Sequence, residues 1–180
     1  MKENLNIIDD NDVVIGIKER EEIHRLGLLH REIHVYFVTP NRELIFQHRA
    51  KDKDTYPDLL DATVGGHVEI GDGYQETAVK EALEETGIRI NAEDLILITK
   101  SKRRFEDKVT STINNVIGEV YLYIFKGDVA DLKIEEGKAL GFELWPLDDL
   151  PELDSQGSER FIPYVLEFAN NEVKKAINSL

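Results

Sequence analysis

The sequence predicts a mixed α/β layered domain. Segments rich in β-branched and aromatic residues lie on both sides of a central stretch with helical spacing, and a second helical stretch closes the chain. The chain has 180 residues, of which 41% are hydrophobic and 32% are charged. This composition supports a real core, so we expect a single domain over residues 1–180.

The first third of the chain contains predicted strands and loops. We expect a short strand at 13–18, within an N-terminal extension covering 1–30. The segments 32–39 and 43–48 are separated by Pro-Asn-Arg and predict a hairpin. A polar loop with a proline follows, and an extended, glycine-rich stretch then leads to the central helix.

The remaining elements follow from a change in periodicity. Residues 73–86 have helical spacing, and Gly87 follows where a C-cap glycine belongs. Three more strands are expected, at 94–104, 115–126 and 138–145. A long C-terminal helix is expected over 158–178, starting near Pro163.

The charge balance limits the classes of partner. The net charge is -14, from 36 acidic and 22 basic side chains, and an acidic surface repels DNA and RNA. A small phosphorylated ligand remains compatible, because a bound cation reverses the local sign. There is no cysteine, no secretory signal pattern at the start, and no apolar run near the roughly 20 residues of a membrane span. We therefore expect a cytoplasmic protein that binds neither a nucleic acid polymer nor a membrane.

The central helix carries an acidic face. Glu81, Glu84 and Glu85 follow an i, i+3, i+4 spacing, so their carboxylates share one side of the helix. Such a cluster repels itself unless water or a cation screens it, and carboxylate oxygens suit Mg²⁺. The alternative is a plain solvated face. The preceding Gly65 and Gly66 favour a ligand site, because glycine lets the backbone approach a ligand closely.

The segment from Gly66 to Ile88, GHVEIGDGYQETAVKEALEETGI, resembles the Nudix box, G-x5-E-x7-R-E-U-x-E-E-x-G-U, in which U is apolar. Asp72 replaces the family's Glu, and Lys80 replaces its Arg. The resemblance implies an α/β/α sandwich and a Mg²⁺- or Mn²⁺-dependent hydrolase of nucleoside diphosphate derivatives. By position it makes Glu81, Glu84 and Glu85 metal ligands, joined by the Gly66 carbonyl, and it gives Asp72 and Lys80 a supporting role as an ion pair.

The segment from His34 to His67 is similar to the Nudix-fold isopentenyl-diphosphate isomerases. The resemblance implies metal binding at His34 and His67 and diphosphate contacts from Arg49 and Lys53. It also places Glu119 in an acidic centre. From the residues alone, His34 is expected to pack within its strand. For His67 two interpretations stay open, contact with a metal or a place in the loop lining, and we group it with the substrate-binding residues. His24 and His30 have no clear partner and are expected to be structural or exposed.

The isomerase cysteine falls at Gly65, so isomerase chemistry is not expected. The sequence instead predicts water attack on a small-molecule diphosphate, with Glu84 and Glu85 acting at the metal. Glu119 is the predicted general base, with Glu135 and Glu136 as rivals. The second class is a non-catalytic module that binds a nucleotide or metabolite. A homodimer formed through the C-terminal helix also stays open.

Overall fold

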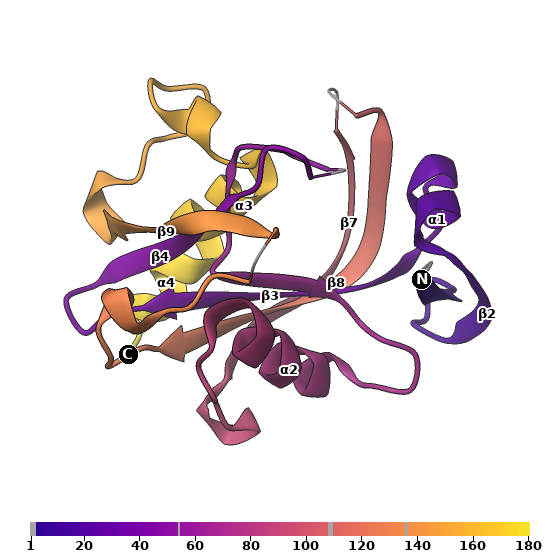
Figure 1. Ribbon diagram of the computed structural model, residues 1–180, viewed down its shortest axis with the longest axis horizontal. Helices are drawn as coiled ribbons and strands as arrows, with labels where there is room; N and C mark the ends of the chain where they lie inside the picture. Colours follow the sequence, from indigo (N-terminus) through magenta and orange to yellow (C-terminus); the bar gives the residue numbers. More distant parts are fainter. Residues whose placement is uncertain (1–2, 54, 108–109, 136) are drawn as a thin grey trace.

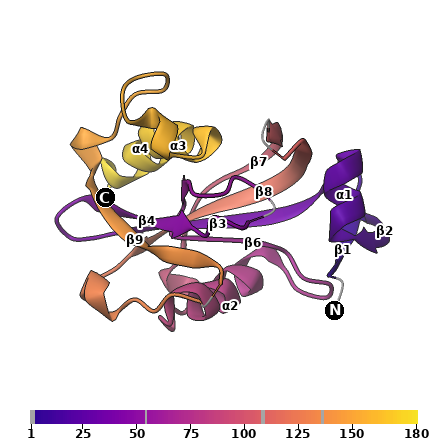
Figure 2. The same cartoon turned by 45° about the horizontal axis from the view of Figure 1, so that its top comes forward.

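The central layer of the fold is a mixed sheet, seen edge-on between helices in Figure 2. The computed structural model describes residues 3–53, 55–107, 110–135 and 137–180. The strands of this sheet are β3 (His30–Val38), β4 (Glu43–Arg49), β5 (Leu60–Asp61), β6 (Val64–His67), β7 (Ile96–Asp107), β8 (Thr112–Ile124) and β9 (Ala139–Pro146). The predicted hairpin and the later strands are therefore present, with bounds shifted by a few residues.

The position of β3 in the sheet decides where the site forms. Strands β5, β4, β3, β8 and β7 follow one another across the sheet, and β3 and β8 are parallel. On its other edge, β3 pairs first with β6 and then with β4, while β9 pairs with β4. The edge of β3 thus divides between two partners, and the short strand β6 lies at that division.

Helix α2 (Tyr74–Thr86) covers one face of the sheet (Figure 1). The side chain of Glu76 accepts a hydrogen bond from the Gly73 N–H at 2.7 Å, which caps the first turn. Gly87 ends the helix in the left-handed conformation, at φ 71°, as the sequence predicts. Ala78 and Ala82 are fully buried against strand residues of the sheet, so the opposite side of the helix is left to its acids.

The C-terminal helical segment covers the other face and completes the predicted α/β/α sandwich. It consists of α3 (Pro163–Phe168), a π-helical turn (Ala169–Val173) and α4 (Lys174–Ile177). The helix begins at Pro163 and not at 158, because proline fits the first helical position and Phe161 bridges to Leu60. Short 3₁₀ turns occupy Ala92–Asp94, Val129–Asp131, Leu147–Asp149 and Ser158–Arg160. Among the described residues, no helix is long and apolar enough to cross a membrane.

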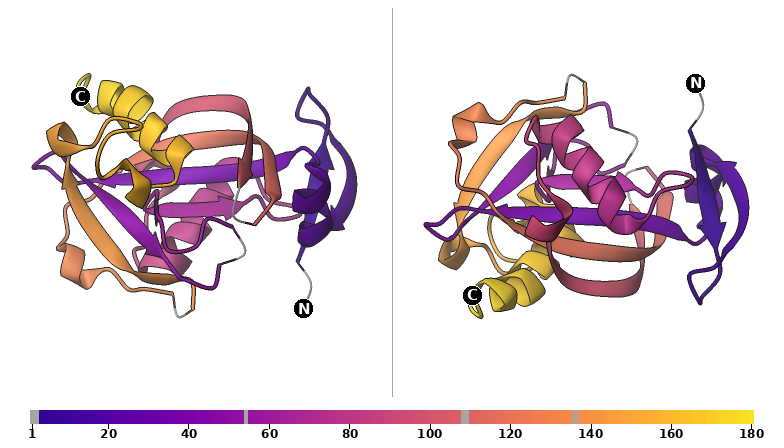
Figure 3. Two further views of the ribbon diagram at one scale, coloured as in Figure 1. Left: turned by 90° about the horizontal axis from the view of Figure 1, so that it is seen from above. Right: turned by 90° about the horizontal axis from the view of Figure 1, so that it is seen from below.

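The N-terminal residues form a small unit at one end of the sheet (Figure 3). Strands β1 (Asn4–Ile8) and β2 (Val14–Glu19) pair antiparallel, and α1 (Arg20–Leu26) follows. The sequence predicts only the second strand. A five-residue strand and a seven-residue helix are too short to show a clear period, so packing against the domain decides them.

One carboxylate docks this unit onto the domain. Asp12, in the turn between β1 and β2, accepts hydrogen bonds from Arg31 Nε at 2.6 Å and from the Tyr74 hydroxyl at 3.1 Å. Lys100 Nζ lies 2.8 Å from the same side chain. Asp12 therefore joins β3, β7 and the first residue of α2.

We expect Asp12→Asn to destabilise the fold. Asparagine tolerates the left-handed backbone of this position, at φ 63°, but it loses the charge that holds Arg31 and Lys100. The free energy of unfolding should fall by about 1.5 kcal/mol and Tm by roughly 3–6 °C, measured by thermal unfolding at pH 7. Asp10→Asn, at a carboxylate that is 79% exposed, is the control and should change Tm little. An equal Tm for both variants would contradict the docking role.

Candidate active site

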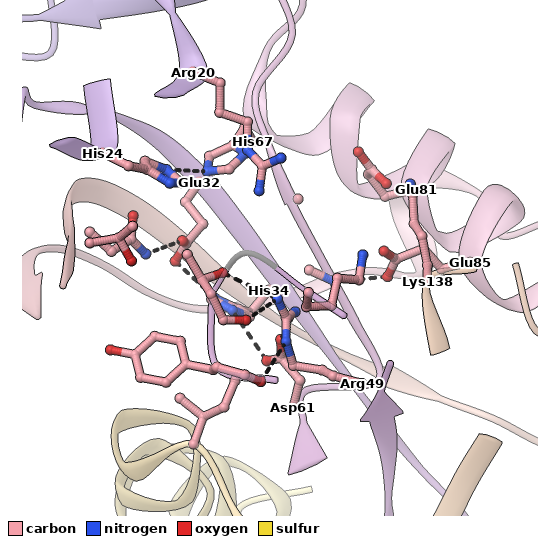
Figure 4. A pocket seen from close by; sticks show the side chains of 18 of the residues that line it. Arg20, His24, Glu32, His34, Arg49, Asp61, His67, Glu81, Glu85 and Lys138 are labelled. Carbon is pink, nitrogen blue, oxygen red and sulfur yellow. Dashed lines mark hydrogen bonds and ion pairs between the residues drawn. The ribbon is translucent and has the colours of Figure 1, made fainter. Parts of the chain in front are cut away.

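A polar pocket opens at the edge of β6, between α2 and the pocket floor on β3 (Figure 4). Its walls come from elements far apart in the chain: α1, β3, β4, β5, β6, α2, β8, and the segments before β9 and in α3. The residues that line it are Glu3, Arg20, His24, Glu32, His34, Arg49, Lys53, Thr55, Tyr56, Asp61, Gly65, Gly66, His67, Glu81, Glu85, Thr112, Asn114, Lys138, Ile162 and Tyr164. Most of the predicted site residues are therefore brought together here.

Two glycines allow the helix and the floor to approach β6. Gly66 pairs with Ile33 in the ladder, and a Cβ at this position would lie 2.5 Å from Glu81 Oε1. Any larger residue would push Glu81 away. A Cβ at Gly65 would face the floor instead, 3.2 Å from the His34 ring. Alternation along the strand thus turns one glycine to each side of the pocket.

The three acids of α2 differ in how far their side chains are exposed to solvent. Glu85 is buried, and its Oε2 accepts hydrogen bonds from Gln47 Nε2 at 3.2 Å and from the Gly65 N–H at 3.1 Å. Burial raises the pKa of Glu85 to about 8 and that of Glu81 to about 7, and the neighbouring carboxylates add to both shifts. Glu84 is exposed and lies outside the pocket lining. Two of the three predicted ligands therefore face the pocket directly.

The residues that depart from the box pattern form the expected ion pair. Lys80 Nζ contacts Asp72 and lies 3.3 Å from Glu69 Oε2. This contact joins the loop before α2 to the middle of the helix on its exposed side. A supporting role for Asp72 and Lys80 is compatible with this geometry, although lysine makes a less directional contact than the family's arginine.

Three histidines meet on the wall opposite α2. His24 of α1, His30 at the start of β3 and His67 at the end of β6 have ring centroids 5.0–5.2 Å apart. His24 Nε2 and His67 Nε2 are 3.1 Å apart, and His30 Nδ1 lies 3.0 Å from the Leu28 carbonyl. His24 and His30 are buried, not exposed, and they are cluster members rather than isolated residues.

The cluster has the electronic character of a cation site. A carbonyl only accepts, so His30 donates through Nδ1 and its Nε2 carries a lone pair. That Nε2 is buried without a hydrogen-bond partner among the described residues. Burial, together with the neighbouring histidines, lowers the pKa of His67 well below its usual value, and burial lowers that of His30. Neutral imidazoles that face one another are what a divalent cation requires.

The floor of the pocket is a chain of paired charges. His34 Nδ1 lies 3.3 Å from Glu32 Oε1, and its Nε2 lies 3.7 Å from Asp61 Oδ1. Arg103 pairs with Glu32 from below, at 3.3 Å. His34 is therefore packed within its strand, as the residues alone predict, and it stands apart from the three-histidine cluster.

The two predicted phosphate ligands differ in availability. Arg49 donates to Asp61 Oδ2 at 2.8 Å, to the Thr55 carbonyl at 2.8 Å and to the Tyr56 carbonyl at 3.2 Å. These bonds leave little donor capacity for a phosphate. Lys53 lines the pocket with its ammonium, whose pKa is lowered by burial and by the nearby Arg49 charge.

The predicted general bases lie away from the pocket or are already paired. Glu119 hydrogen-bonds to the Tyr121 hydroxyl and lies 3.2 Å from Lys100, in a groove at the first turn of α2. Glu119 is not among the residues that line the pocket, although Thr112 and Asn114 of the same strand are. Glu135 pairs with Lys138 at 2.8 Å. Glu136 lies outside the described residues.

Comparison with known proteins agrees with this architecture. A NUDIX domain model matches residues 28–165, which is most of the chain. The chain belongs to the Nudix family. It is 29% identical to an uncharacterized Nudix hydrolase of Clostridium acetobutylicum, over 89% of this chain and 81% of that protein. It is 26% identical to an isopentenyl-diphosphate Delta-isomerase of Pectobacterium atrosepticum, over 86% and 83% of the two chains.

A solved structure from Deinococcus radiodurans has the same fold as this Nudix chain. Its TM-score is 0.66 at 23% identity, and the match covers 82% of this chain and 86% of that one. Outside the Nudix box, sequence reasoning missed Lys138, Glu32 and the pairing of His24 with His30. No local signal marks them, because each comes from a different element and only the fold brings them together.

The shifted carboxylates of this Nudix site predict a pH effect. The pKa values of Glu81 and Glu85, about 7 and about 8, exceed the ordinary 4.5, so the folded state binds more protons than the unfolded state between these values. The free energy of unfolding of metal-free protein should therefore fall as pH rises from about 5 to about 8. Thermal unfolding in chelator across this range measures it.

Saturating Mg²⁺ should reverse the trend, since a cation stabilises the ionised carboxylates. Glu85→Gln should remove most of the fall in chelator, because the residue with the larger shift no longer titrates. A Tm that stays constant or rises with pH in chelator would contradict the burial argument.

Proposed function

We propose that this chain hydrolyses a diphosphate linkage in a small phosphorylated metabolite, using Mg²⁺ or Mn²⁺ held at Glu81, Glu84 and Glu85. The observation that carries this proposal is the pair of carboxylates, buried Glu85 and half-buried Glu81, that lie against Gly65 and Gly66. Among the described residues Glu85 accepts hydrogen bonds from two neutral donors, and a Cβ at Gly66 would fill the space that Glu81 occupies. Burying such charge is costly unless a cation offsets it, so the residues fit a divalent ion.

A divalent ion bound there would supply an activated water and neutralise charge on the diphosphate. The chain's own residues would do the rest. The Gly65 N–H and Gln47 fix the Glu85 carboxylate, and Gly66 leaves its carbonyl near Glu81. Lys53 lines the pocket and supplies a cation that could contact a phosphate oxygen. With Glu119 outside the pocket lining, the proton acceptor is best sought among the box acids, where burial raises the pKa of Glu81 to about 7 and that of Glu85 to about 8.

Two alternatives have specific support. A binding module without turnover is supported by the lysine and aspartate at positions 80 and 72. Isomerisation is supported by the relative from Pectobacterium atrosepticum, but the position of the isomerase cysteine is Gly65, and no cysteine exists elsewhere in the chain. Hydrolysis accounts for the complete set of box acids, which neither alternative requires.

Glu85→Gln should abolish hydrolysis. The change replaces an acceptor that two donors face, and it removes one proposed metal ligand and one candidate base. We expect kcat/KM for a hydrolysed diphosphate substrate to fall at least about 100-fold, or ~2.7 kcal/mol of transition-state stabilisation. The measurement is phosphate release across nucleoside diphosphate sugars, dinucleotides, nucleoside triphosphates and coenzymes, with Mg²⁺ or Mn²⁺.

Glu93→Gln, at an exposed carboxylate after α2, is the matched control and should retain wild-type rates. A protein that binds these compounds and releases no product from any of them would instead be the binding module. Wild-type turnover by Glu85→Gln would refute the assignment of this carboxylate.

The three-histidine cluster favours a second cation position within the same pocket. Its ligand nitrogens lie within 4.8 Å of one another, and the orphaned His30 Nε2 gives it an unused acceptor. Imidazole nitrogens prefer Zn²⁺, Mn²⁺ or Co²⁺ to Mg²⁺. The two positions would then differ in chemistry, with oxygen ligands on α2 and nitrogen ligands on the facing wall.

His30→Ala should remove one metal equivalent without affecting the carboxylate position. Titration calorimetry with Mn²⁺ or Zn²⁺ and elemental analysis of the protein measure the stoichiometry. His48→Ala is the control, because His48 pairs with Asp58 at 3.0 Å outside the cluster. An unchanged number of bound ions in His30→Ala would exclude the cluster as a metal site.

A further inference from the structure

Lys138 is a pocket cation that the sequence does not point to. It is the residue before β9, and backbone bonds fix it: its N–H donates to the Glu135 carbonyl, and its carbonyl accepts from the Ala50 N–H, both at 3.1 Å. Its ammonium lies 2.8 Å from Glu135, and its side chain is 36% exposed. Lys138 is thus anchored at both ends, with its ammonium directed into the pocket.

Figure 4 shows the Lys138 side chain alongside those of Glu81 and Glu85. Burial would lower the pKa of Lys138, but its contact with the Glu135 carboxylate and the charges of Glu81 and Glu85 raise it overall, so the side chain stays charged. An ammonium has three donors. One serves Glu135, which leaves donors for a ligand above the carboxylates.

The charge balance of the site creates a need for such a group. Three carboxylates and one divalent cation leave a net charge of -1, and a diphosphate ester brings further negative charge to the same place. In a partly buried site this repulsion is strong, because the effective dielectric constant is well below that of water. Arg49 is engaged by the protein, and Lys53 lies in the loop after β4 and lines the same pocket. Lys138 is a cation whose charge interacts with both Glu81 and Glu85.

We propose that Lys138 binds a non-bridging oxygen of the substrate diphosphate beside the α2 carboxylates, and that Glu135 positions its ammonium. The inference rests on the proposed function, because it assumes that a diphosphate enters this pocket. It assigns Glu135 to holding the lysine and not to accepting a proton from water. The diphosphate would then be held between a divalent cation on one side and an ammonium on the other.

The role has a signature that a purely structural residue lacks. An ammonium next to metal ligands repels an incoming cation while it attracts the diphosphate. Removing it should therefore tighten metal binding and weaken diphosphate binding. A lysine that only stabilised the local fold would weaken both when replaced.

The test uses the full chain and methylenediphosphonate, which resists hydrolysis. In Lys138→Gln, the Kd for methylenediphosphonate at saturating Mg²⁺ should rise about tenfold, while the Kd for Mn²⁺ without diphosphonate should fall about threefold, both by titration calorimetry. Lys138→Arg should stay within about threefold of wild type for both ligands, since the charge is kept. Lys51→Gln is the matched control, because Lys51 is 73% exposed, pairs with Asp58 and does not line the pocket.

Glu135→Gln tests the positioning role. The Kd for methylenediphosphonate should rise about threefold, and Lys138→Gln with Glu135→Gln should equal Lys138→Gln alone. The inference is overturned if Lys138→Gln binds methylenediphosphonate as wild type does, if its Mn²⁺ affinity falls in parallel, or if wild type binds no diphosphonate. If Lys138→Gln shows the opposed shifts in Kd while the wild-type protein hydrolyses no diphosphate, this inference stands and the proposed hydrolase activity is refuted.

Discussion

The hydrogen bond from the Gly65 N–H to the buried Glu85 carboxylate is the contact on which the site depends. It joins α2 to β6, near the point on the edge of β3 where pairing with β6 ends and pairing with β4 begins. Gln47 of β4 donates to the same oxygen, so one carboxylate ties three elements together. Burial of the Glu85 carboxylate disfavours its ionised form, which is why its pKa is raised to about 8. The fold holds this arrangement because the rest of α2 is packed by small residues that fix its distance from the sheet.

The pocket separates its charges in space although the chain is strongly acidic. The α2 wall carries carboxylates, the facing wall carries neutral histidines, and the floor carries ion pairs that cancel internally. Under the proposed function, this division would let an anionic ligand enter a protein of net charge -14, because the repulsive charges are confined to positions where cations would bind. Arg49 and Lys138 show the consequence for basic residues. Arg49 donates to Asp61 and Thr55 of the protein itself. Lys138 pairs with one acid, Glu135, and keeps further N–H donors for a ligand.

Local pattern predicted the central helix, its glycine cap, the hairpin and the three later strands, because each has a period or a turn that its own residues impose. It also predicted the Glu81–Glu85 face and the contact of Lys80 with Asp72, since the partners lie within the range of one helix and its loop. It failed for α1 and β1, where tertiary packing decides. The residues that meet α2 at the pocket could not be predicted for the same reason. Glu119 lies in a separate groove at the first turn of α2, because strand alternation alone does not say which part of the site a strand residue faces.

Gly65 shows how a shared frame can serve different chemistry. The position pairs with His34 in the ladder and faces the pocket floor, and a side chain there would contact the His34 ring at 3.2 Å. In the isomerase resemblance this is the place of the cysteine, directly above the floor. With glycine present, position 65 presents no thiol to that floor, while its backbone N–H donates to Glu85 on the other wall. The loss of one side chain therefore leaves the metal-facing half of the pocket intact and removes the reactive group from the opposite half. The chemistry that remains is that of the carboxylates, which favours hydrolysis.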